Sequence, residues 1–370
     1  MKFLLPPLSF LLLTACVGAQ PEPEADLNTF GLDSLPDEFS QRTFDQFSAS
    51  AWLGSFKSAD LNFLVEKAIK ANRTLAQEAA AVRLAEQNVR ISDSTLWPNL
   101  GLSLSTQRDD TGMGSATQSG LSLTAGYEVD LWGRLNAVQQ QSQIDLARQK
   151  ASYREAERTL VRDVVNAGFD ASSATQLLGL LNQRFTNLTE SLDVIERGYR
   201  SGLNDALDVY LSRNTLELER AGIANQQQIH FEALTRLELL LGDYPAAKLA
   251  VSANLQSLHL DPIAAGIPAN LLSRRSDIQQ AWLELLSADA GVAIAHRNRF
   301  PALNLSGSLS DSSQELDELL DGGSLMWRVA ASLIQPLFQG GRLAALEEQA
   351  KIRLEQREKR YLEVTERGQR

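Results

Sequence analysis

The chain has 370 residues and a formal net charge of -11, from 46 acidic and 35 basic residues. This balance argues against a partner with a phosphate backbone, because no surplus of Lys and Arg is present to displace counterions, and we therefore expect no nucleic acid. Hydrophobic residues make up 44% of the sequence, which is enough for a buried core. The sequence has no run of about 18 apolar residues that would form a transmembrane helix.

The first residues, MKFLLPPLSFLLLTAC, have the pattern of an export signal, with Lys2, a short apolar stretch and small residues before Cys16. LTAC resembles the bacterial lipobox, in which residues 1–15 are removed and the cysteine receives a diacylglycerol and an N-acyl chain. The alternative is a chance free cysteine, usually a small buried residue. Val17 replaces the Asp that commonly retains such lipoproteins at the inner membrane, which by the same resemblance implies the outer membrane. We expect no cofactor besides this lipid.

The next segment, residues 16–56, is rich in Pro and acidic residues and predicts an extended, lipid-anchored tether. A helical pattern begins near Lys57 and runs without interruption to Pro98. After Pro98 the period of the apolar residues changes to two. This change predicts that strands follow the helix.

Four segments alternate between apolar and polar residues, and they are expected as strands at about 99–108, 119–132, 302–310 and 324–335. A polar, Gly-rich stretch between the first two is expected as a long loop in water. One face of the strands carries Leu, Val, Tyr and Trp. The other face is polar, and its candidate lumen-facing residues are Ser103, Ser105, Glu128, Asp130, Asn304, Ser306 and Ser308. Length and alternation favour transmembrane β-strands, although a soluble antiparallel sheet gives the same pattern.

Four strands are too few to close a cylinder in lipid, where each unpaired backbone group costs several kcal/mol and the smallest single-chain barrels have about eight strands. Two or three chains are therefore expected to pool their strands around a water-filled lumen. Glu128 and Asp130 would then face water, and their charge is expected to favour cations.

Between the strand pairs, apolar residues recur at alternate spacings of four and three, which is the seam of a coiled coil. The seam consists of Leu160, Val164, Ala167, Ala171, Ala174, Leu178, Leu181, Phe185, Leu188, Leu192 and Ile195. A helix from Arg134 to about Tyr199 would be roughly 100 Å long. Gly198 and Gly202 then predict a turn, after which Leu207, Leu211, Leu218 and Ala221 resume a three-and-four pattern in the return helix. Residues 134–241 thus predict a helical hairpin.

Two short motifs recur, which indicates an internal duplication. WPNL at Trp97 returns as FPAL at Phe300, and WGRL at Trp132 returns as GGRL at Gly340. The repeat distance of roughly 200 residues is too long for a solenoid. We therefore divide the chain into a first repeat at 57–245, a linker at 246–275 and a second repeat at 276–370, whose helix begins near 340. Ser276 is expected to cap the first helix of the second repeat.

Seven motifs together resemble the TolC-like outer-membrane efflux factors, in the lipoprotein (NodT-like) branch that serves RND-type multidrug efflux. They are LTAC, LVEKAIKANRTL, YEVDLWGRL, GYRSGLNDALDVYLSRNTL, IPANLLSRRSDIQQA, RFPALNLSGS and QPLFQGGRL. The resemblance implies a mainly α fold with a transmembrane β part. In it, four strands per chain join a homotrimeric, 12-stranded β-barrel, and long antiparallel helical hairpins form a periplasmic α-barrel.

The same resemblance implies a passive exit duct for small molecules in the outer membrane of a Gram-negative bacterium, extending into the periplasm. Its expected partners are a periplasmic adaptor (membrane fusion protein) and an inner-membrane RND-type transporter. The residues that match the family's adaptor-facing tip are Gly198, Tyr199, Arg200, Gly202, Leu207, Asp208 and Val209. Asp208 can equally be a solvated carboxylate at a helix start.

One departure from the family concerns the second helical hairpin, which starts at Gly341 and stops at Arg370, whereas the first runs from Gly133 to about Leu241. The sequence is therefore expected to be a truncated or partial form that lacks the second tip. A milder departure is Ser276, which stands where the family usually has proline.

Signals of catalysis are missing from the sequence. A single cysteine excludes a CxxC site, His230, His259 and His296 lack the short spacings of zinc ligands, and no nucleophile-elbow or phosphate-loop motif occurs. We expect no enzyme and no metal site. Two other functions stay open, namely a conduit for type I protein secretion and a lipid-anchored periplasmic coiled-coil scaffold without a pore.

Overall fold

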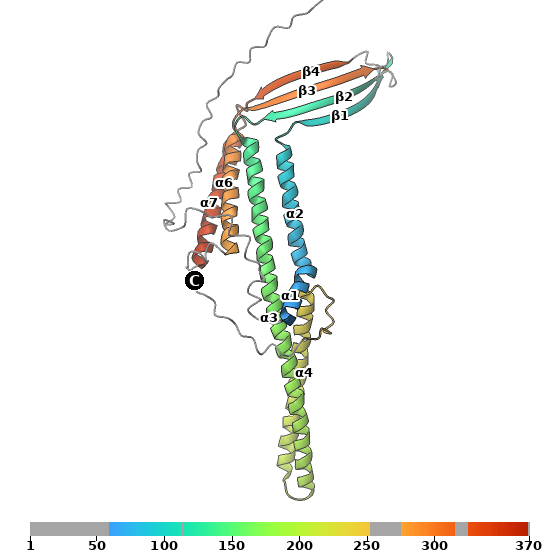
Figure 1. Cartoon of the computed structure of the whole chain (residues 1–370), viewed down its shortest axis with the longest axis vertical. Helices are drawn as coiled ribbons and strands as arrows, with labels where there is room; N and C mark the ends of the chain where they lie inside the picture. The colour runs from blue at the N-terminus through green and yellow to red at the C-terminus, as the bar shows by residue number, and fades with distance from the viewer. Residues whose placement is uncertain (1–58, 111, 113, 252–274, 315–324, 369–370) are drawn as a thin grey trace, which may run out of the picture. The chain divides into compact units, whose positions relative to one another are not determined.

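The computed structural model describes residues 59–110, 112, 114–251, 275–314 and 325–368. In this part of the chain the elements are α1 (Ala59–Ala71), α2 (Arg73–Ser94), β1 (Asn99–Asp110), β2 (Ser115–Val129), α3 (Arg134–Arg200), α4 (Ala206–Leu240), α6 (Ser276–Arg297), β3 (Ala302–Ser313), β4 (Met326–Ile334) and α7 (Arg342–Gly368) (Figure 1). The predicted signal, Cys16, the tether and His259 lie outside the described residues. Most of the predicted linker does so as well.

The four strands form one antiparallel sheet in the order β1-β2-β3-β4. Each strand predicted from the alternation is present, so this part of the fold prediction is confirmed. The second and third strands pair from Ser119 opposite Ser313 to Val129 opposite Leu303. The two halves of the duplicated sequence therefore meet in the middle of the sheet.

The long loop expected between the first two strands is wrong. β1 continues to Asp110 and β2 begins at Ser115, so that four residues separate the two strands. The Ser and Thr residues of this stretch extend the ladder, and Arg108 donates to the Ser115 hydroxyl across it at 3.1 Å. Polar residues can continue a strand wherever the strand leaves its apolar surroundings, because the backbone pairing does not depend on them.

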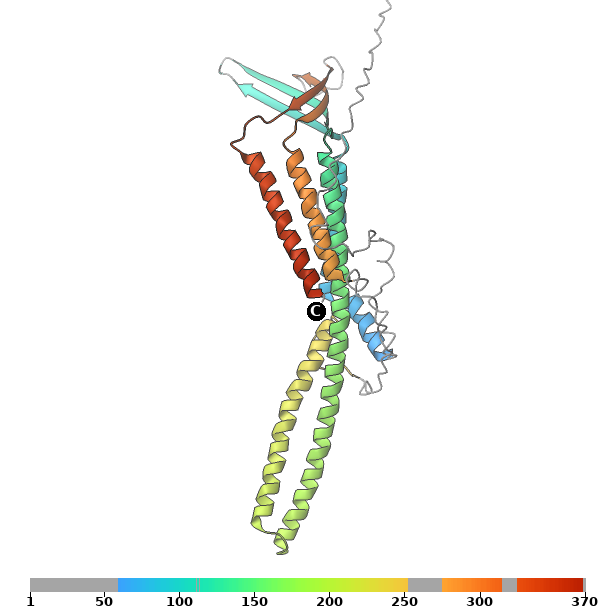
Figure 2. The same ribbon diagram turned by 90° about the vertical axis from the view of Figure 1, so that its left-hand side faces the viewer.

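The helices adjoin the sheet at the ends of the strands, where α2 and α6 end and α3 and α7 begin (Figures 1 and 2). α3 contacts α1, α2, α4 and α6, and α6 contacts α7. The main apolar core lies where α1, α2, α3 and the end of α4 meet. Its members are Val65, Ala68, Leu75, Leu160, Val161, Val164, Val165, Ala167, Ala171, Leu234, Leu237 and Leu241.

The first helical segment is broken, whereas the sequence predicted an uninterrupted helix from Lys57 to Pro98. Asn72 separates α1 from α2, and its side-chain oxygen accepts a hydrogen bond from the Leu75 N–H at 3.0 Å. Its amide nitrogen donates to the Leu240 carbonyl at 3.0 Å. Asn is a favoured N-cap, so the residue ends one helix, starts the next and ties both to α4.

The long hairpin predicted at 134–241 is present as α3 and α4, which pack side by side (Figure 2). The predicted seam of α3 is confirmed. Its members from Leu160 to Ala174 are buried, and those from Leu178 to Ile195 are half-buried among exposed neighbours.

The predicted return helix is present, but the residues of its three-and-four pattern, Leu207, Leu211, Leu218 and Ala221, are all exposed and do not mark its contact with α3. The face that meets α3 consists of Val209, Ser212, Leu216, Glu219, Ile223, Gln226 and His230, at the same three-and-four spacing. Several of these residues are polar, with partners on α3: Gln226 donates to the Ala174 carbonyl at 3.2 Å. The pattern of hydrophobic residues in α4 therefore does not identify the face that contacts α3.

The start of α6 also differs from the prediction. The N-cap is Arg275, and Ser276 is the first helical residue, so it does not cap the helix. The Ser276 hydroxyl instead hydrogen-bonds to the Glu155 carboxylate and receives a 3.3 Å hydrogen bond from Arg158, both on α3. The first helical position is also where proline is tolerated, because its N–H has no partner within the helix.

Across the ranges that the structure describes, no helix is both long enough and apolar enough to cross a lipid bilayer.

Candidate functional site

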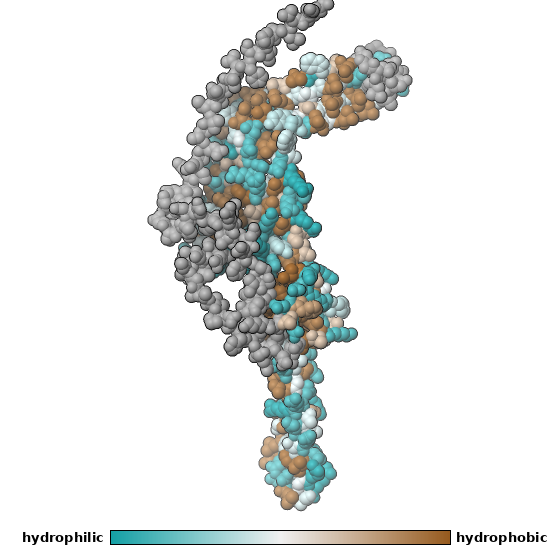
Figure 3. Space-filling view, viewed as in Figure 1, coloured by the Kyte–Doolittle hydropathy of each residue, from teal (hydrophilic) through white to brown (hydrophobic). Residues whose placement is uncertain are grey.

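The register of the sheet divides its residues into two faces of opposite polarity. Leu102, Leu123, Leu309 and Trp327 lie in one row across the four strands, because each is paired with its neighbour. Leu102 and Trp327 are exposed by 72% and 77%. Hydrophobic side chains gather over these strands in the space-filling view (Figure 3). Such a large exposed apolar surface marks a face that contacts lipid or another protein.

Apolar residues of this face run along β2 from Val129 to Leu121, and on β3 the row of Leu121 carries Asp311. Residues 121–129 lie within β2, and their number is at the lower end of the roughly 9–11 residues that a tilted transmembrane β-strand needs. In the next row the residues are Thr106, Ser119 and Ser313, and the Thr106 and Ser119 hydroxyls lie 3.2 Å apart. The apolar band therefore ends where the polar extension of the hairpin begins.

The opposite face of the sheet is small and polar. From β1 to β4 its polar residues and glycines are Asn99, Gly101, Ser103, Ser105, Gly120, Ser122, Thr124, Gly126, Glu128, Asn304, Ser306, Ser308, Ser310, Arg328 and Ser332. The same face also carries Ala302, Met326, Ala330 and Ile334. All the predicted lumen-facing residues within the strands lie on this face, whereas Asp130 follows the end of β2. Whether this face lines a lumen is still a prediction. Arg328 was missing from the predicted set, although the alternation with Ser332 already placed it on this face.

Aromatic side chains mark the four places where a helix joins a strand. Trp97 precedes β1, Trp132 follows β2, Phe300 precedes β3 and Phe338 follows β4. All four are exposed. Trp132 stacks on Phe300 with 5.2 Å between ring centroids, and its Nε1 donates to the Pro301 carbonyl at 2.7 Å. Aromatic residues at this level resemble the interfacial girdle that flanks the apolar band of membrane barrels.

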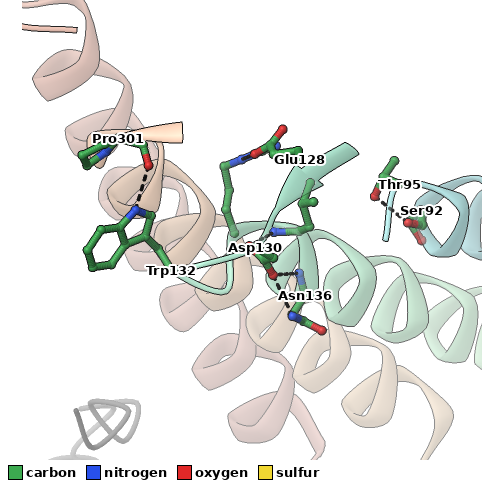
Figure 4. Close-up of polar contacts among 9 residues, drawn as sticks. Ser92, Thr95, Glu128, Asp130, Trp132, Asn136 and Pro301 are labelled. Atoms are coloured by element: carbon green, nitrogen blue, oxygen red, sulfur yellow. Dashed lines mark hydrogen bonds and ion pairs between the residues drawn. The ribbon is translucent and has the colours of Figure 1, made fainter. Parts of the chain in front are cut away.

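The two acidic residues at the junction of β2 and α3 both have partners (Figure 4). Glu128 accepts from the Arg134 Nη2 at 2.7 Å, and both side chains are 29% exposed. Asp130 accepts from the backbone N–H groups of Leu135 and Asn136 at 3.0 and 2.9 Å. Asp130 therefore satisfies the free N–H groups at the start of α3, where a negative charge is favourable.

Gly133 makes the turn between β2 and α3 with a φ of 73°, in the left-handed region. Its carbonyl accepts a 2.8 Å hydrogen bond from Arg297 at the end of α6. The junction of the first repeat is thus tied to that of the second. A cavity of about 210 Å³ lies beside this contact, lined among others by Trp132, Arg134 and Asn304.

The turn between α3 and α4 is closed by backbone and side-chain hydrogen bonds. Gly202 has a φ of 75°, and the Leu203 N–H donates to the Gly198 carbonyl at 2.8 Å. Asn204 donates to the Ile195 carbonyl at 3.2 Å. The predicted tip is therefore a well-ordered turn.

Asp208 belongs to a capping box at the start of α4. The Asp208 N–H donates to the Asp205 carboxylate at 3.0 Å, and the Asp208 carboxylate accepts from the Asp205 N–H at 3.4 Å. This arrangement corresponds to the second interpretation of Asp208, a carboxylate at a helix start. A contact between Asp208 and an adaptor is still a prediction.

The other predicted tip residues differ in exposure. Tyr199 and Leu207 are exposed, Arg200 pairs with Glu196 at 3.5 Å, and Val209 is buried in the seam with α3. Tyr199, Arg200, Leu207 and Asp208 are exposed side chains of this set that a partner could reach, whereas Val209 supports the hairpin.

An open, polar groove of about 720 Å³ runs between α3, α6 and α7. Ion pairs and hydrogen bonds cross it, including Arg357 with Glu284 at 2.8 Å and Ser287 with Asp145 at 3.0 Å. Within the described ranges, no three His, Cys, Asp or Glu side chains gather in a way that would hold a metal ion.

A sheet with one apolar face and one polar face, joined to long paired helices, defines a subunit of a membrane channel. The family model "Outer membrane efflux protein" matches residues 64–243 and 267–365, which is most of the chain. The chain therefore belongs to the outer membrane efflux protein family. Membership places it in the outer membrane and gives it an efflux function.

Relatives and solved structures agree with this assignment. The chain is 27% identical over 315 residues to the cation efflux system protein CusC of Escherichia coli, covering 84% of this chain and 68% of CusC. It is 29% identical over 300 residues to the toluene efflux pump outer membrane protein TtgF of Pseudomonas putida, covering 79% of this chain and 62% of TtgF.

Among solved structures, a membrane protein from Pseudomonas aeruginosa has a TM-score of 0.76 at 28% identity, covering 85% of this chain and 75% of that chain. The CmeC outer membrane channel of Campylobacter jejuni has a TM-score of 0.78 at 22% identity, covering 85% of this chain and 70% of that chain. The likeness to CmeC supports the fold.

Proposed function

We propose that the chain is one subunit of an exit duct for small molecules, in which three copies pool their sheets around a water-filled lumen. The observation that carries the proposal is the two-faced register of the sheet. Its apolar rows have the length of a transmembrane β-strand, and most residues of its opposite face are Ser, Gly, Asn and Thr. The role is transport, and no catalytic step is part of the proposal.

The need for several copies follows from the two edges of the sheet. β1 and β4 each pair on one side within the described residues, and an open edge cannot persist in hydrocarbon. Because the sheet has four antiparallel strands, β4 of one copy would meet β1 of the next in antiparallel orientation. Three copies supply twelve strands, an even number as in bacterial barrels.

The proposal extends to the partners that the chain needs. A passive pore supplies no energy for transport. The duct would therefore receive solutes from an inner-membrane transporter through a periplasmic adaptor. The turn between α3 and α4, with Tyr199 and Leu207 exposed, is the surface that we assign to the adaptor. We also propose that Cys16 carries the diacylglycerol and N-acyl chains that help to hold the chain in the outer membrane.

Spin labels on neighbouring residues of β2 test the function directly. Leu123→Cys lies on the apolar face and Thr124→Cys on the polar face, at the same depth in the sheet. In outer-membrane vesicles we expect the label at 123 to be accessible to oxygen and the label at 124 to a water-soluble nickel chelate. Equal accessibilities at the two positions would contradict the proposal.

A second measurement separates the duct from a scaffold that is held only by its lipid. Outer-membrane fractions of the duct should contain oligomers that dissociate on heating. A scaffold would instead be released intact as a monomer when Cys16 is replaced by serine.

A further inference from the structure

Charge is scarce in the middle of the polar face of the sheet. The central row consists of Gly101, Thr124, Ser308 and Arg328, each paired with the next. Of these four residues, Arg328 alone carries a charge.

The rows on either side are uncharged as well. One consists of Asn99, Gly126, Ser306 and Ala330, and the other of Ser103, Ser122, Ser310 and Met326. Three rows span about 13 Å along the strands, at about 3.3 Å per residue. Over this length each subunit presents one charge on the polar face, and it is positive.

Arg328 is exposed, and no other described residue forms an ion pair or a hydrogen bond with its side chain. The acidic residues closest to the periplasmic end of the sheet have partners of their own. Glu128 is bound by Arg134, and Asp130 accepts from the N-terminus of α3. The sequence predicted that these two acidic residues would favour cations. In the structure both carboxylates have hydrogen-bonding partners, whereas the Arg328 guanidinium has none among the described residues.

We propose that Arg328 is the charge filter of the duct, so that the pooled subunits place a ring of guanidinium groups around the lumen and favour anionic and uncharged solutes over cations. The inference rests on the proposed function, because a ring forms only if the polar face lines a lumen. The guanidinium stays protonated at any physiological pH, so the filter would be permanent.

The physical basis is the electric field inside a water-filled pore with walls of low dielectric constant. Charged rings in such pores raise the local concentration of counter-ions and repel ions of the same sign, and substitutions that face the lumen of a barrel tune its selectivity. Salt screens this field over about 10 Å at 0.1 M and about 30 Å at 0.01 M. The preference should therefore be strongest in dilute salt.

A position on the lipid face would have been costly for the same side chain. An Arg side chain near the middle of a bilayer destabilises a barrel when it lies on the outer surface. The register instead puts Arg328 opposite Ser308, between the lipid-side residues Trp327 and Val329. Its place in the alternation agrees with a side chain that lies in water.

The test is the reversal potential of the full chain in planar bilayers under a KCl gradient at about 0.01–0.1 M. We expect the unmodified protein to prefer chloride over potassium. Arg328→Gln should lower the ratio of chloride to potassium permeability by at least about twofold in dilute salt, Arg328→Glu should invert the preference, and Arg328→Lys should retain it.

Arg108→Gln is the matched control. It removes the same charge from the same sheet, but Arg108 pairs with Thr117 in a row that continues the apolar face, so it does not face the proposed lumen. Its permeability ratio should equal that of the unmodified protein.

The results separate the selectivity proposed for Arg328 from the proposed function as an exit duct. If the unmodified chain gives no conductance, the proposed function is overturned and the inference with it. If the chain conducts but all variants share one reversal potential, the duct stands and the inference is overturned. If Arg328→Gln abolishes the heat-sensitive oligomer, Arg328 is a contact between subunits, and the inference is overturned as well.

Discussion

The Glu347 carboxylate on α7 accepts a 2.7 Å hydrogen bond from Arg299, which lies between α6 and β3. Lys351 and His296 approach the same carboxylate at 3.1 and 3.3 Å, and the Glu347 side chain is 10% exposed. The Arg299 hydrogen bond is the main cause that lowers the pKa of Glu347 to about 2, against the opposing effect of burial. Arg299 and His296 thus hold α7 beside the end of α6, and Lys351 binds the same carboxylate from within α7.

We predict that Glu347→Gln loosens α7 and lowers the free energy of unfolding by about 2 kcal/mol, because three hydrogen-bond donors lose their charged acceptor. Hydrogen exchange of α7 amides at neutral pH would measure the effect. Glu348→Gln is the control, since Glu348 is the next residue of the same helix and is exposed. Equal exchange rates in the two variants would contradict the prediction.

The contribution of Glu347 should also depend on pH. Its folded pKa lies below the ordinary value of 4.5, so the stabilisation is complete above the unfolded pKa and is lost as the pH falls towards about 2. The stability difference between the unmodified protein and Glu347→Gln should therefore shrink between about pH 5 and pH 2. Urea unfolding of the two proteins at several pH values in this range measures the difference, and a difference that does not change with pH would contradict the prediction.

A second prediction concerns Glu238, near the end of α4, whose buried carboxylate accepts from the backbone N–H groups of residues 246–249 at 2.6–3.0 Å. Burial raises the pKa of Glu238, but these four hydrogen bonds outweigh it and hold the pKa below its usual value. Glu238→Ala should free the segment and destabilise the protein by more than about 2 kcal/mol. Faster proteolysis within residues 242–251 would report the change, and the exposed Glu232→Ala provides the control.

A third prediction contrasts two glycines of the α3 region. Gly133 has a φ of 73°, and a Cβ there would lie 3.5 Å from Arg297, so space is available but the backbone would be strained. Gly133→Ala should therefore cost roughly 1–2 kcal/mol. Gly179 lies inside α3 with open space around it, and Gly179→Ala should stabilise the protein by about 0.5–1 kcal/mol. Thermal unfolding would show shifts of opposite sign, and shifts of the same sign would refute the argument.

Much of the sheet could be predicted from the sequence, because a period of two assigns each residue to a face without knowledge of the partner strand. Leu102 and Ser103 illustrate this, since one lies in an apolar row and the other in a polar row. The pairing of β2 with β3 could not be read from the sequence, because it joins residues far apart in the chain, from Ser119 with Ser313 to Val129 with Leu303. The hairpin loop was misplaced because its polar residues carry no signal of burial.

The sequence could predict on which face of the sheet a candidate functional residue lies. It could not predict the hydrogen-bond or ion-pair partner of that residue. Asp130 was assigned to a lumen from its charge, whereas the structure shows it bonded to the N–H groups that start α3. An acidic residue a few positions before a predicted helix is itself a capping signal that could have found this role. Arg328 was overlooked because its strand has a mixed polar face, and only the register shows how isolated its charge is.

The last prediction tests which side of α4 faces α3. Leu216 is 8% exposed and lies in the contact face, whereas Leu218, two residues further along the helix, is 65% exposed. Leu216→Ala removes buried methyl groups and should destabilise the hairpin by about 2–3 kcal/mol, and Leu218→Ala should change the stability of the hairpin by less than about 0.5 kcal/mol. Amide hydrogen exchange within residues 206–226 separates the two effects. A larger loss of protection in Leu218→Ala would contradict the prediction. It would mean that α4 is rotated about its axis so that Leu218 faces α3, since residues 216 and 218 lie on different faces of a helix.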